Sequence, residues 1–336
     1  MDYLWQLGLF AGKALLVVVA IVTVLMVFFG LLMRQRGLHH LEIENLNEKH
    51  KDLADLLKSQ ILDKKDLKAE KKKNKKAEKD KIESQVEKKR AYVIDFDGDI
   101  RASNVNCLRE EITTVLRVCR PNDEVIVRLE SSGGLVHSYG LAASQLERVK
   151  REKIKLTVCV DKVAASGGYM MACVADQIIA APFAILGSVG VLAQVPNFHR
   201  LLKKHDIDYQ EITAGEYKRT ISVLGEITPQ GKEKFMEQIG DTHELFKEYV
   251  ATHRPQVSLS EIATGEHWFG LRALKMKLAD RLDTSDSYIT SLEKDFDIYR
   301  VAYAAKKKLS EKIASAVQIS LERILEKILS QTQRFL

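Results

Sequence analysis

The chain has few cysteines, and their spacing excludes two kinds of site. Only four cysteines occur among 336 residues, at positions 107, 119, 159 and 173. A structural zinc site or a dithiol redox site needs cysteines a few positions apart, and no such pair is present. Cys159 and Cys173 lie in apolar runs, so we expect both to pack as small hydrophobic side chains.

Histidine shows no metal-binding pattern either. The nine histidines form no His-Glu-x-x-His motif and no other paired-ligand spacing. We therefore predict that the protein holds no metal and needs no cofactor.

The chain lacks a basic folded surface, although its net charge is +6. Residues 64–90 hold thirteen Lys or Arg against six Asp or Glu, a balance of +7 that leaves −1 for all other residues. This Lys-rich run has no interleaved aromatic residues and is typical of a solvated segment near lipid headgroups. We expect no nucleic-acid partner, because only generic phosphate attraction would support one.

One long stretch lacks charge altogether. Residues 14–33 contain a single polar side chain, Thr23, and a helix of this length would reach about 30 Å, the thickness of a bilayer core. The apolar part of a cleaved signal peptide is shorter and ends in small residues, and a buried core helix keeps a polar face. The sequence therefore predicts one N-terminal transmembrane helix that anchors the chain in the lipid bilayer.

Two further segments flank the expected globular domain. Residues 34–90 are predicted to form a Lys-rich stalk, helical or disordered, and a loose heptad at 34–63 suits a short coiled coil as well as a mobile stalk. Residues 301–336 are predicted to include an amphipathic C-terminal helix. Its apolar stripe would pack on its own domain or on a neighbouring protomer, or lie on the membrane.

Between residues 91 and 300 the pattern alternates between two kinds of element. Strands are expected at 91–98, 124–130, 155–160 and 177–182, and helices at 104–119, 136–150 and 167–175. This alternation predicts an α/β domain with a largely parallel sheet. The working residues of such sheets lie on loops at strand ends, where two glycine-rich turns occur, at 131–134 and 165–170.

The turn around Ser166 suits acyl transfer. Ser166 follows an apolar strand and a short loop and precedes a helix, so its hydroxyl would lie beside exposed backbone N–H groups. The amide of Gly167 can point at a developing oxyanion, and the helix dipole favours negative charge there. The turn at 131–134 can supply a second donor. Ser-Gly-Gly on its own is a weak signal, because glycine after a strand usually marks only a turn.

A serine nucleophile also needs a group that takes its proton. No histidine stands in a recognisable motif with an acidic partner, which leaves a lysine whose pKa is lowered by burial. Two lysines are candidates: Lys162, four residues before Ser166, and Lys218, in the segment AGEYKRT. The residues alone leave both open, and either can be an ordinary solvated lysine.

Several motifs in order resemble those of a known family. The segments RLESSGGLVHSYGLAASQL, VDKVAASGGYMMACVAD, APFAILGSVGV and TGEHWFG are similar to those of the SppA-like signal peptide peptidases, within the ClpP/crotonase superfamily. The resemblance covers residues 92 to about 283. It implies a spiral of ββα units and a serine endopeptidase that acts through an acyl-enzyme. It also implies a homo-oligomer, peptide or protein substrates such as signal-peptide remnants, and a place in the bacterial inner membrane.

The resemblance assigns roles to individual residues. The family's nucleophile corresponds to Ser166 and its base to Lys218, while the serine that orients the base corresponds to Ser188 in GSVG. The oxyanion-hole glycines correspond to Gly133, Gly134 and Gly167.

Two departures from the family pattern affect local turns. Ser132 replaces the usual proline of the SPGG turn, and Lys277 stands where glycine is common. Two other functions stay open at this point. One is an acyl-CoA enzyme of the crotonase type, which needs no anchor and gives Lys218 no role. The other is a non-catalytic membrane scaffold, which the stalk and the tail would suit. The side of the membrane that the catalytic domain faces also stays open.

Overall fold

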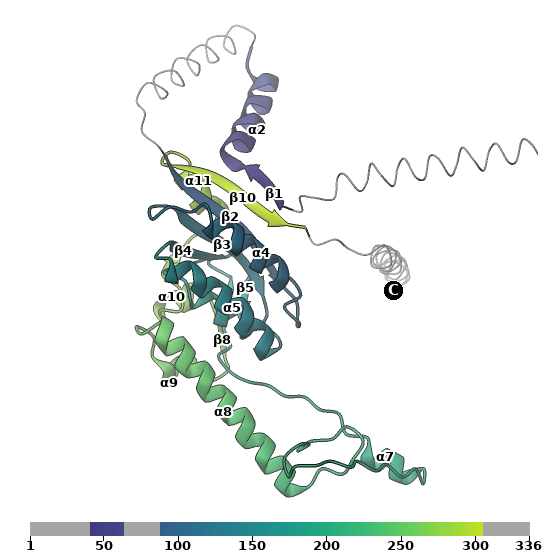
Figure 1. Cartoon of the computed structure of the whole chain (residues 1–336). Coiled ribbons are helices and arrows are strands. Elements are labelled where there is room, and N and C mark those ends of the chain that lie inside the picture. The colour runs from purple at the N-terminus through teal and green to yellow at the C-terminus, as the bar shows by residue number, and fades with distance from the viewer. Residues whose placement is uncertain (1–40, 64–87, 305–336) are drawn as a thin grey trace, which may run out of the picture. The chain divides into compact units, whose positions relative to one another are not determined.

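The computed structural model describes residues 41–63 and 88–304, and one compact unit runs from Ile43 to Ala302. The elements in chain order are β1 (Leu41–Asn45), α2 (Leu46–Ile61), β2 (Lys89–Gly98), α4 (Val105–Leu116), β3 (Glu124–Ser131), α5 (Val136–Arg151), β4 (Lys155–Val160), β5 (Val163–Ala165), α6 (Gly167–Ala172), β6 (Gln177–Ala180), β7 (Ile185–Gly187), α7 (His199–Lys204), α8 (Pro229–His253), α9 (Leu259–Ile262), β8 (His267–Phe269), α10 (Gly270–Lys275), β9 (Arg281–Leu282), α11 (Ser285–Leu292) and β10 (Phe296–Tyr303). Figure 1 shows their arrangement.

The ten strands of the described residues belong to one sheet. Its main path has the order β1-β10-β2-β3-β4-β6-β9, and the pairs from β10 to β9 are parallel. A short branch leaves the end of β3, where β5 pairs with Ser131 and with β7, and β7 pairs with β8 in the antiparallel sense. The predicted α/β domain with a largely parallel sheet is confirmed. The finer expectation, a spiral of ββα units, stays a prediction.

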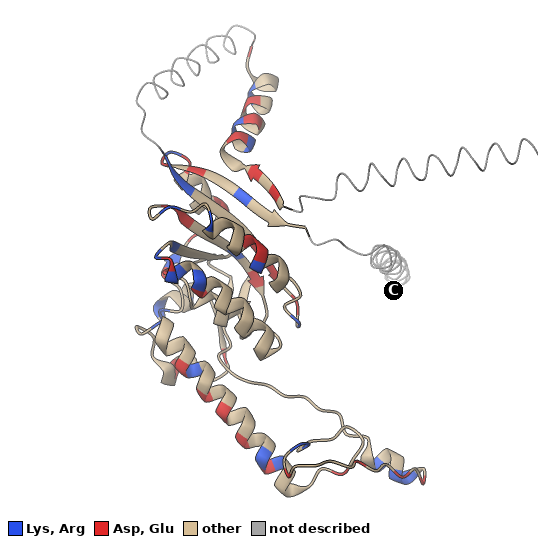
Figure 2. Cartoon of the chain, in the orientation of Figure 1, with Lys and Arg blue, Asp and Glu red and all other residues tan. Residues whose placement is uncertain are grey.

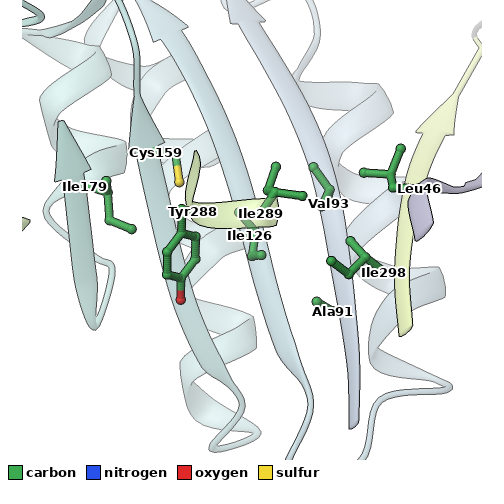
Figure 3. Close-up of a cluster of buried hydrophobic side chains, with 9 residues drawn as sticks. All are labelled: Leu46, Ala91, Val93, Ile126, Cys159, Ile179, Tyr288, Ile289 and Ile298. Carbon is green, nitrogen blue, oxygen red and sulfur yellow. The ribbon is translucent and has the colours of Figure 1, made fainter. Parts of the chain in front are cut away.

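Central strands carry apolar residues on both faces because helices cover both sides of the sheet. Helices α4 and α5 lie over one face (Figure 1). Helix α11 packs on the other through a buried cluster that Figure 3 shows: Leu46, Ala91, Val93, Ile126, Cys159, Ile179, Tyr288, Ile289 and Ile298. Cys159 and Cys173 are buried and free, as predicted, and burial raises the pKa of Cys159 to about 12. The predicted elements from 91 to 182 are all present.

The globular part begins earlier than the predicted boundary at residue 91. Strand β1 extends the sheet next to β10, and Leu46, at the start of α2, is 6% exposed in the core cluster. The side chain of Asn47 donates to the Phe296 carbonyl at 3.1 Å and accepts the amide of Ile298 at 2.7 Å. Part of the predicted stalk (34–90) therefore belongs to the folded unit. Along α2 and α8, Figure 2 shows both signs of charge interspersed.

The predicted transmembrane helix at 14–33 lies outside the described residues, as do 64–87 of the stalk and 305–336 of the tail. In the ranges 41–63 and 88–304, no helix is both long and apolar enough to cross a bilayer.

Helix α8 is attached to the domain through its C-terminal half, where Phe246 and Val250 are buried. The residue that follows it, Arg254, has a side chain that is 2% exposed. This side chain donates to both carboxylate oxygens of Asp280, at 2.9 and 2.8 Å, and to the Lys277 carbonyl at 2.7 Å. Burial alone would lower the pKa of Arg254, but the hydrogen bonds with Asp280 outweigh it and raise the pKa. Lys277 has φ 61°, so the left-handed turn that glycine would favour is formed here by lysine.

We expect Arg254→Met to lower the free energy of unfolding by roughly 2 kcal/mol, because it removes the hydrogen bonds that a 2% exposed guanidinium donates to Asp280 and to the Lys277 carbonyl. Arg109→Met, on the exposed side of α4, should change it by less than about 0.5 kcal/mol. Denaturant unfolding of the full chain measures both. Equal stabilities of the two variants would show that this ion pair does not hold α8.

Candidate active site

Ser166 occupies a sharp turn between β5 and α6. Its backbone has φ 51° and ψ −119°, a combination that side chains disfavour and that costs about 1–3 kcal/mol. The turn is held by the Ser166 amide, which donates to the Gly187 carbonyl at 2.8 Å, and by the Ser166 carbonyl, which accepts the Met170 amide at 2.9 Å. Such a strand-to-helix turn brings a serine hydroxyl to the edge of the sheet.

The pairing of β5 with β7 places Ser188 beside Ser166. Ala165 pairs with Gly187 in the parallel register, so Ser166 and Ser188 are the next residues along each strand. Ser188 also has a positive φ, 54°, and its amide donates to the Glu266 carbonyl at 2.6 Å. Two half-buried serines thus lie next to each other at the ends of neighbouring strands.

The two glycine-rich turns meet at Ser166. A Cβ on Gly133, which has φ 90°, would lie 2.7 Å from the Gly167 nitrogen and 2.8 Å from the Ser166 Cβ, so only glycine fits there. The Gly133 amide points inward and donates to the Ser131 hydroxyl at 3.1 Å. In the described part of the chain, the amides of Gly134 and Gly167 donate to no protein group. Both residues line one pocket with Ser166.

This pocket has a volume of about 20 Å³, room for roughly one water molecule. Its other walls are mostly apolar and come from four parts of the chain: Val136, Met170, Gly190, Val191, Thr242 and Phe246. Two donors beside a hydroxyl in a small, partly apolar pocket can stabilise a tetrahedral oxyanion. The sequence did not identify Thr242 and Phe246, whose only signal was a four-residue spacing on α8.

The two candidate lysines lie in different surroundings. The amine of Lys162 is 2.9 Å from a carboxylate oxygen of Glu130, and this hydrogen bond raises the pKa of Lys162. Lys162 is therefore kept protonated, which is the wrong state for a base. Lys218 is exposed and belongs to the arm, the name used here for residues 192–227 between β7 and α8.

The arm contacts the N-terminal end of α8. The Tyr217 ring lies 5.2 Å from the Lys234 amine, and a Cβ on Gly231 would lie 2.5 Å from the Thr220 carbonyl oxygen. Gly231 is about 16 Å along the helix axis from Thr242, which lines the pocket. Within the described residues, no side chain hydrogen-bonds to the Ser166 hydroxyl. The structure thus brings together Ser166, Ser188 and the three glycines, but not Lys218.

Within 41–63 and 88–304, no three His, Cys, Asp or Glu side chains are grouped as metal ligands.

Family models match nearly the whole chain. The model described as "Peptidase family S49 N-terminal" matches residues 2–146, and "Peptidase family S49" matches residues 148–299.

Individual proteins are similar over comparable lengths. "Probable protease SohB" of Haemophilus influenzae is 45% identical and covers 99% of this chain and 98% of its own. The protein of the same name from Buchnera aphidicola subsp. Acyrthosiphon pisum is 49% identical over 72% of each chain. Among solved structures, a 1510-N membrane-bound stomatin-specific protease mutant in complex with a substrate peptide gives a TM-score of 0.41 at 13% identity, covering 69% of this chain and 99% of that one.

We expect Ser166→Gly to raise the free energy of unfolding by about 1 kcal/mol, since glycine relieves the strained φ at some cost in chain entropy. Ser166→Ala keeps the strain, so its free energy of unfolding should not rise. Ala165→Gly, one residue earlier in β5, should lower the free energy of unfolding by about 1 kcal/mol, because it relieves no strain and removes a buried methyl group. Denaturant unfolding compares the three variants, and a Ser166→Gly variant no more stable than Ser166→Ala would argue against strain at this turn.

Proposed function

This chain belongs to peptidase family S49, and from that membership we propose that it is a membrane-anchored serine endopeptidase with Ser166 as nucleophile and Lys218 as base. Family membership favours a peptidase over an acyl-CoA enzyme or a scaffold without activity. The observation that carries the proposal is the strained turn that holds Ser166 in one pocket with the unengaged amides of Gly134 and Gly167.

The chemistry follows from these groups. The Ser166 oxygen bonds to the peptide carbonyl carbon as its proton passes to a neutral lysine amine, and the amides of Gly134 and Gly167 stabilise the oxyanion. The carbon–nitrogen bond then breaks, and the lysine returns the proton to the departing amine. Water then adds to the carbonyl carbon of the acyl-enzyme and gives a proton to the lysine amine. The bond to the Ser166 oxygen breaks, and the lysine returns the proton to that oxygen. Ser188, adjacent to Ser166, is suited to hold the lysine amine in place.

We propose that the base comes from a second copy of the chain. Two observations support a homo-oligomer: Lys218 lies in the arm, which contacts Gly231 of α8 about 16 Å along the helix from the pocket residue Thr242, and the arm exposes large apolar side chains to water. Its exposed apolar residues are Leu192, Val195, Phe198, Leu201, Ile207, Tyr209, Ile212, Tyr217 and Val223. Covering them with a second copy would bury this surface and also surround Lys218, whose amine must lose its proton to act as a base.

The substrates of this proposal are extended peptides in or near the bacterial inner membrane, with signal-peptide remnants as one class. The pocket itself has room for about one water molecule, so a peptide would lie over it, against the apolar side chains of Val136, Met170 and Phe246. Anchoring through residues 14–33 would hold the site close to such substrates in the lipid bilayer.

The dyad is tested with single variants of the full chain in detergent. Ser166→Ala and Lys218→Ala should each lower the cleavage of a fluorogenic leucine-rich peptide by at least about 10³-fold, because each removes a group that the acylation step requires. Lys162→Ala should keep wild-type cleavage, since its amine is paired with Glu130. Wild-type cleavage by Ser166→Ala or by Lys218→Ala would refute the dyad.

Co-expression of the two inactive variants tests where the base comes from. If Ser166 and Lys218 of different copies form one site, random assembly of equal amounts leaves roughly a quarter of the sites complete, and about that share of activity should return. A mixture as inactive as its components would place both residues of each dyad in the same copy.

A further inference from the structure

Beneath the two glycine-rich turns lies a buried pair of hydroxyl groups that the catalytic steps above do not use. Ser131 ends β3 and is 2% exposed, and Tyr139, in α5, is fully buried. The Ser131 Oγ and the Tyr139 Oη are 2.5 Å apart. Both residues lie beside the turns that carry Gly133 and Gly167.

The hydrogen bonds around this pair form one directed chain. The Gly133 amide donates to the Ser131 hydroxyl at 3.1 Å, the Ser131 hydroxyl can donate to the Tyr139 oxygen, and the Tyr139 hydroxyl donates to the Asp99 carbonyl at 2.7 Å. The Gly98 carbonyl, 3.1 Å from the Ser131 Oγ, is a second acceptor for that serine. Buried hydrogen bonds in series strengthen one another, and each is costly to leave unmade.

This chain sets the direction of the peptide groups in the 131–134 turn. The Gly133 amide is directed inward to Ser131, and the next residue, Gly134, lines the Ser166 pocket with an amide that donates to no group of the described residues. The turn is also held from below, because the Leu135 amide donates to the Ile100 carbonyl at 2.9 Å. Loss of the Ser131 hydroxyl would leave the part-buried Gly133 amide without this acceptor and would loosen the turn on that side.

The same two residues also limit the second turn. A Cβ on Gly167 would collide with the Tyr139 ring, and a Cβ on Gly168 would collide with the Ser131 carbonyl oxygen. The first turn of α6 therefore lies directly on Tyr139 and Ser131. One buried pair thus contacts both of the turns that present an unengaged amide to the pocket.

We propose that Ser131 and Tyr139 are positioning residues that align the amides of Gly134 and Gly167 for the oxyanion. This inference rests on the proposed peptidase function. The oxyanion exists only in the transition state and the tetrahedral intermediate, so misplaced donors lower kcat while substrate binding is kept. A purely structural pair would instead lower stability and leave the kinetics of the folded fraction unchanged.

Two variants of the full chain in detergent separate these roles. Tyr139→Phe removes one hydroxyl and keeps the ring on Gly167, and Ser131→Ala removes the acceptor of the Gly133 amide. For the leucine-rich peptide we expect kcat to fall by about 3- to 10-fold in the first and 10- to 100-fold in the second, with KM within about twofold of wild type. Tyr249→Phe, which also removes a partly buried hydroxyl, bonded to Glu147 at 2.7 Å, is the matched control and should keep kcat.

A peptide aldehyde provides the second readout, because its adduct with Ser166 carries the oxyanion. Its inhibition constant should rise in the same proportion as kcat/KM falls across the variants. Kinetics are normalised to the folded fraction, and Tyr139→Phe carries the test if Ser131→Ala does not fold. Unchanged kcat in the folded variants, or a loss confined to KM, would overturn the inference while leaving Ser166-dependent cleavage intact. A wild-type protein without Ser166-dependent cleavage would overturn the proposed function as well.

Discussion

The backbone of Ser166 lies in a region of conformational space that normally only glycine occupies, and the candidate site depends on holding it there. The pairing of β5 with β7 supplies the Gly187 carbonyl on one side, and α6 supplies the Met170 amide on the other. Together these hydrogen bonds hold the backbone of Ser166 in this conformation. The short branch β5-β7-β8 is thus more than an extension of the sheet, because it fixes the backbone from which the hydroxyl projects.

Glycine at the neighbouring positions follows from this crowding. Where the 131–134 turn meets the Ser166 turn, the two backbones approach so closely that a single methyl group would separate them. The close approach has a chemical use, since amides on two different loops converge on one small pocket. The family resemblance named these glycines, and membership of family S49 is confirmed. Only the coordinates show that the Gly133 amide donates to Ser131, whereas Gly134 lines the pocket with an amide that no described residue engages.

The sequence predicted the part of the fold in which local pattern and tertiary packing agree. From residue 91 to 182, apolar strands and amphipathic helices begin and end within three residues of the predicted positions. It did not predict β1, where charged residues in LEIEN hide a strand that lies next to β10 in the sheet, whereas a helix in the region of α2 was among its expectations. The pocket walls from α8 were missed for a similar reason: Thr242 and Phe246 reach Ser166 through a packing contact more than seventy residues away in sequence, which no local pattern encodes.

Helix α8 connects the pocket with the arm. Its C-terminal half packs on the domain through Phe246 and Val250, while its first turns contact the arm about 20 Å away. A tilt of only about 5° around Phe246 would therefore move the far end by about 2 Å. Proton transfer needs its heavy atoms within about 3 Å of each other, so in the proposed dyad a small tilt of this helix would decide whether the Lys218 amine reaches a hydroxyl.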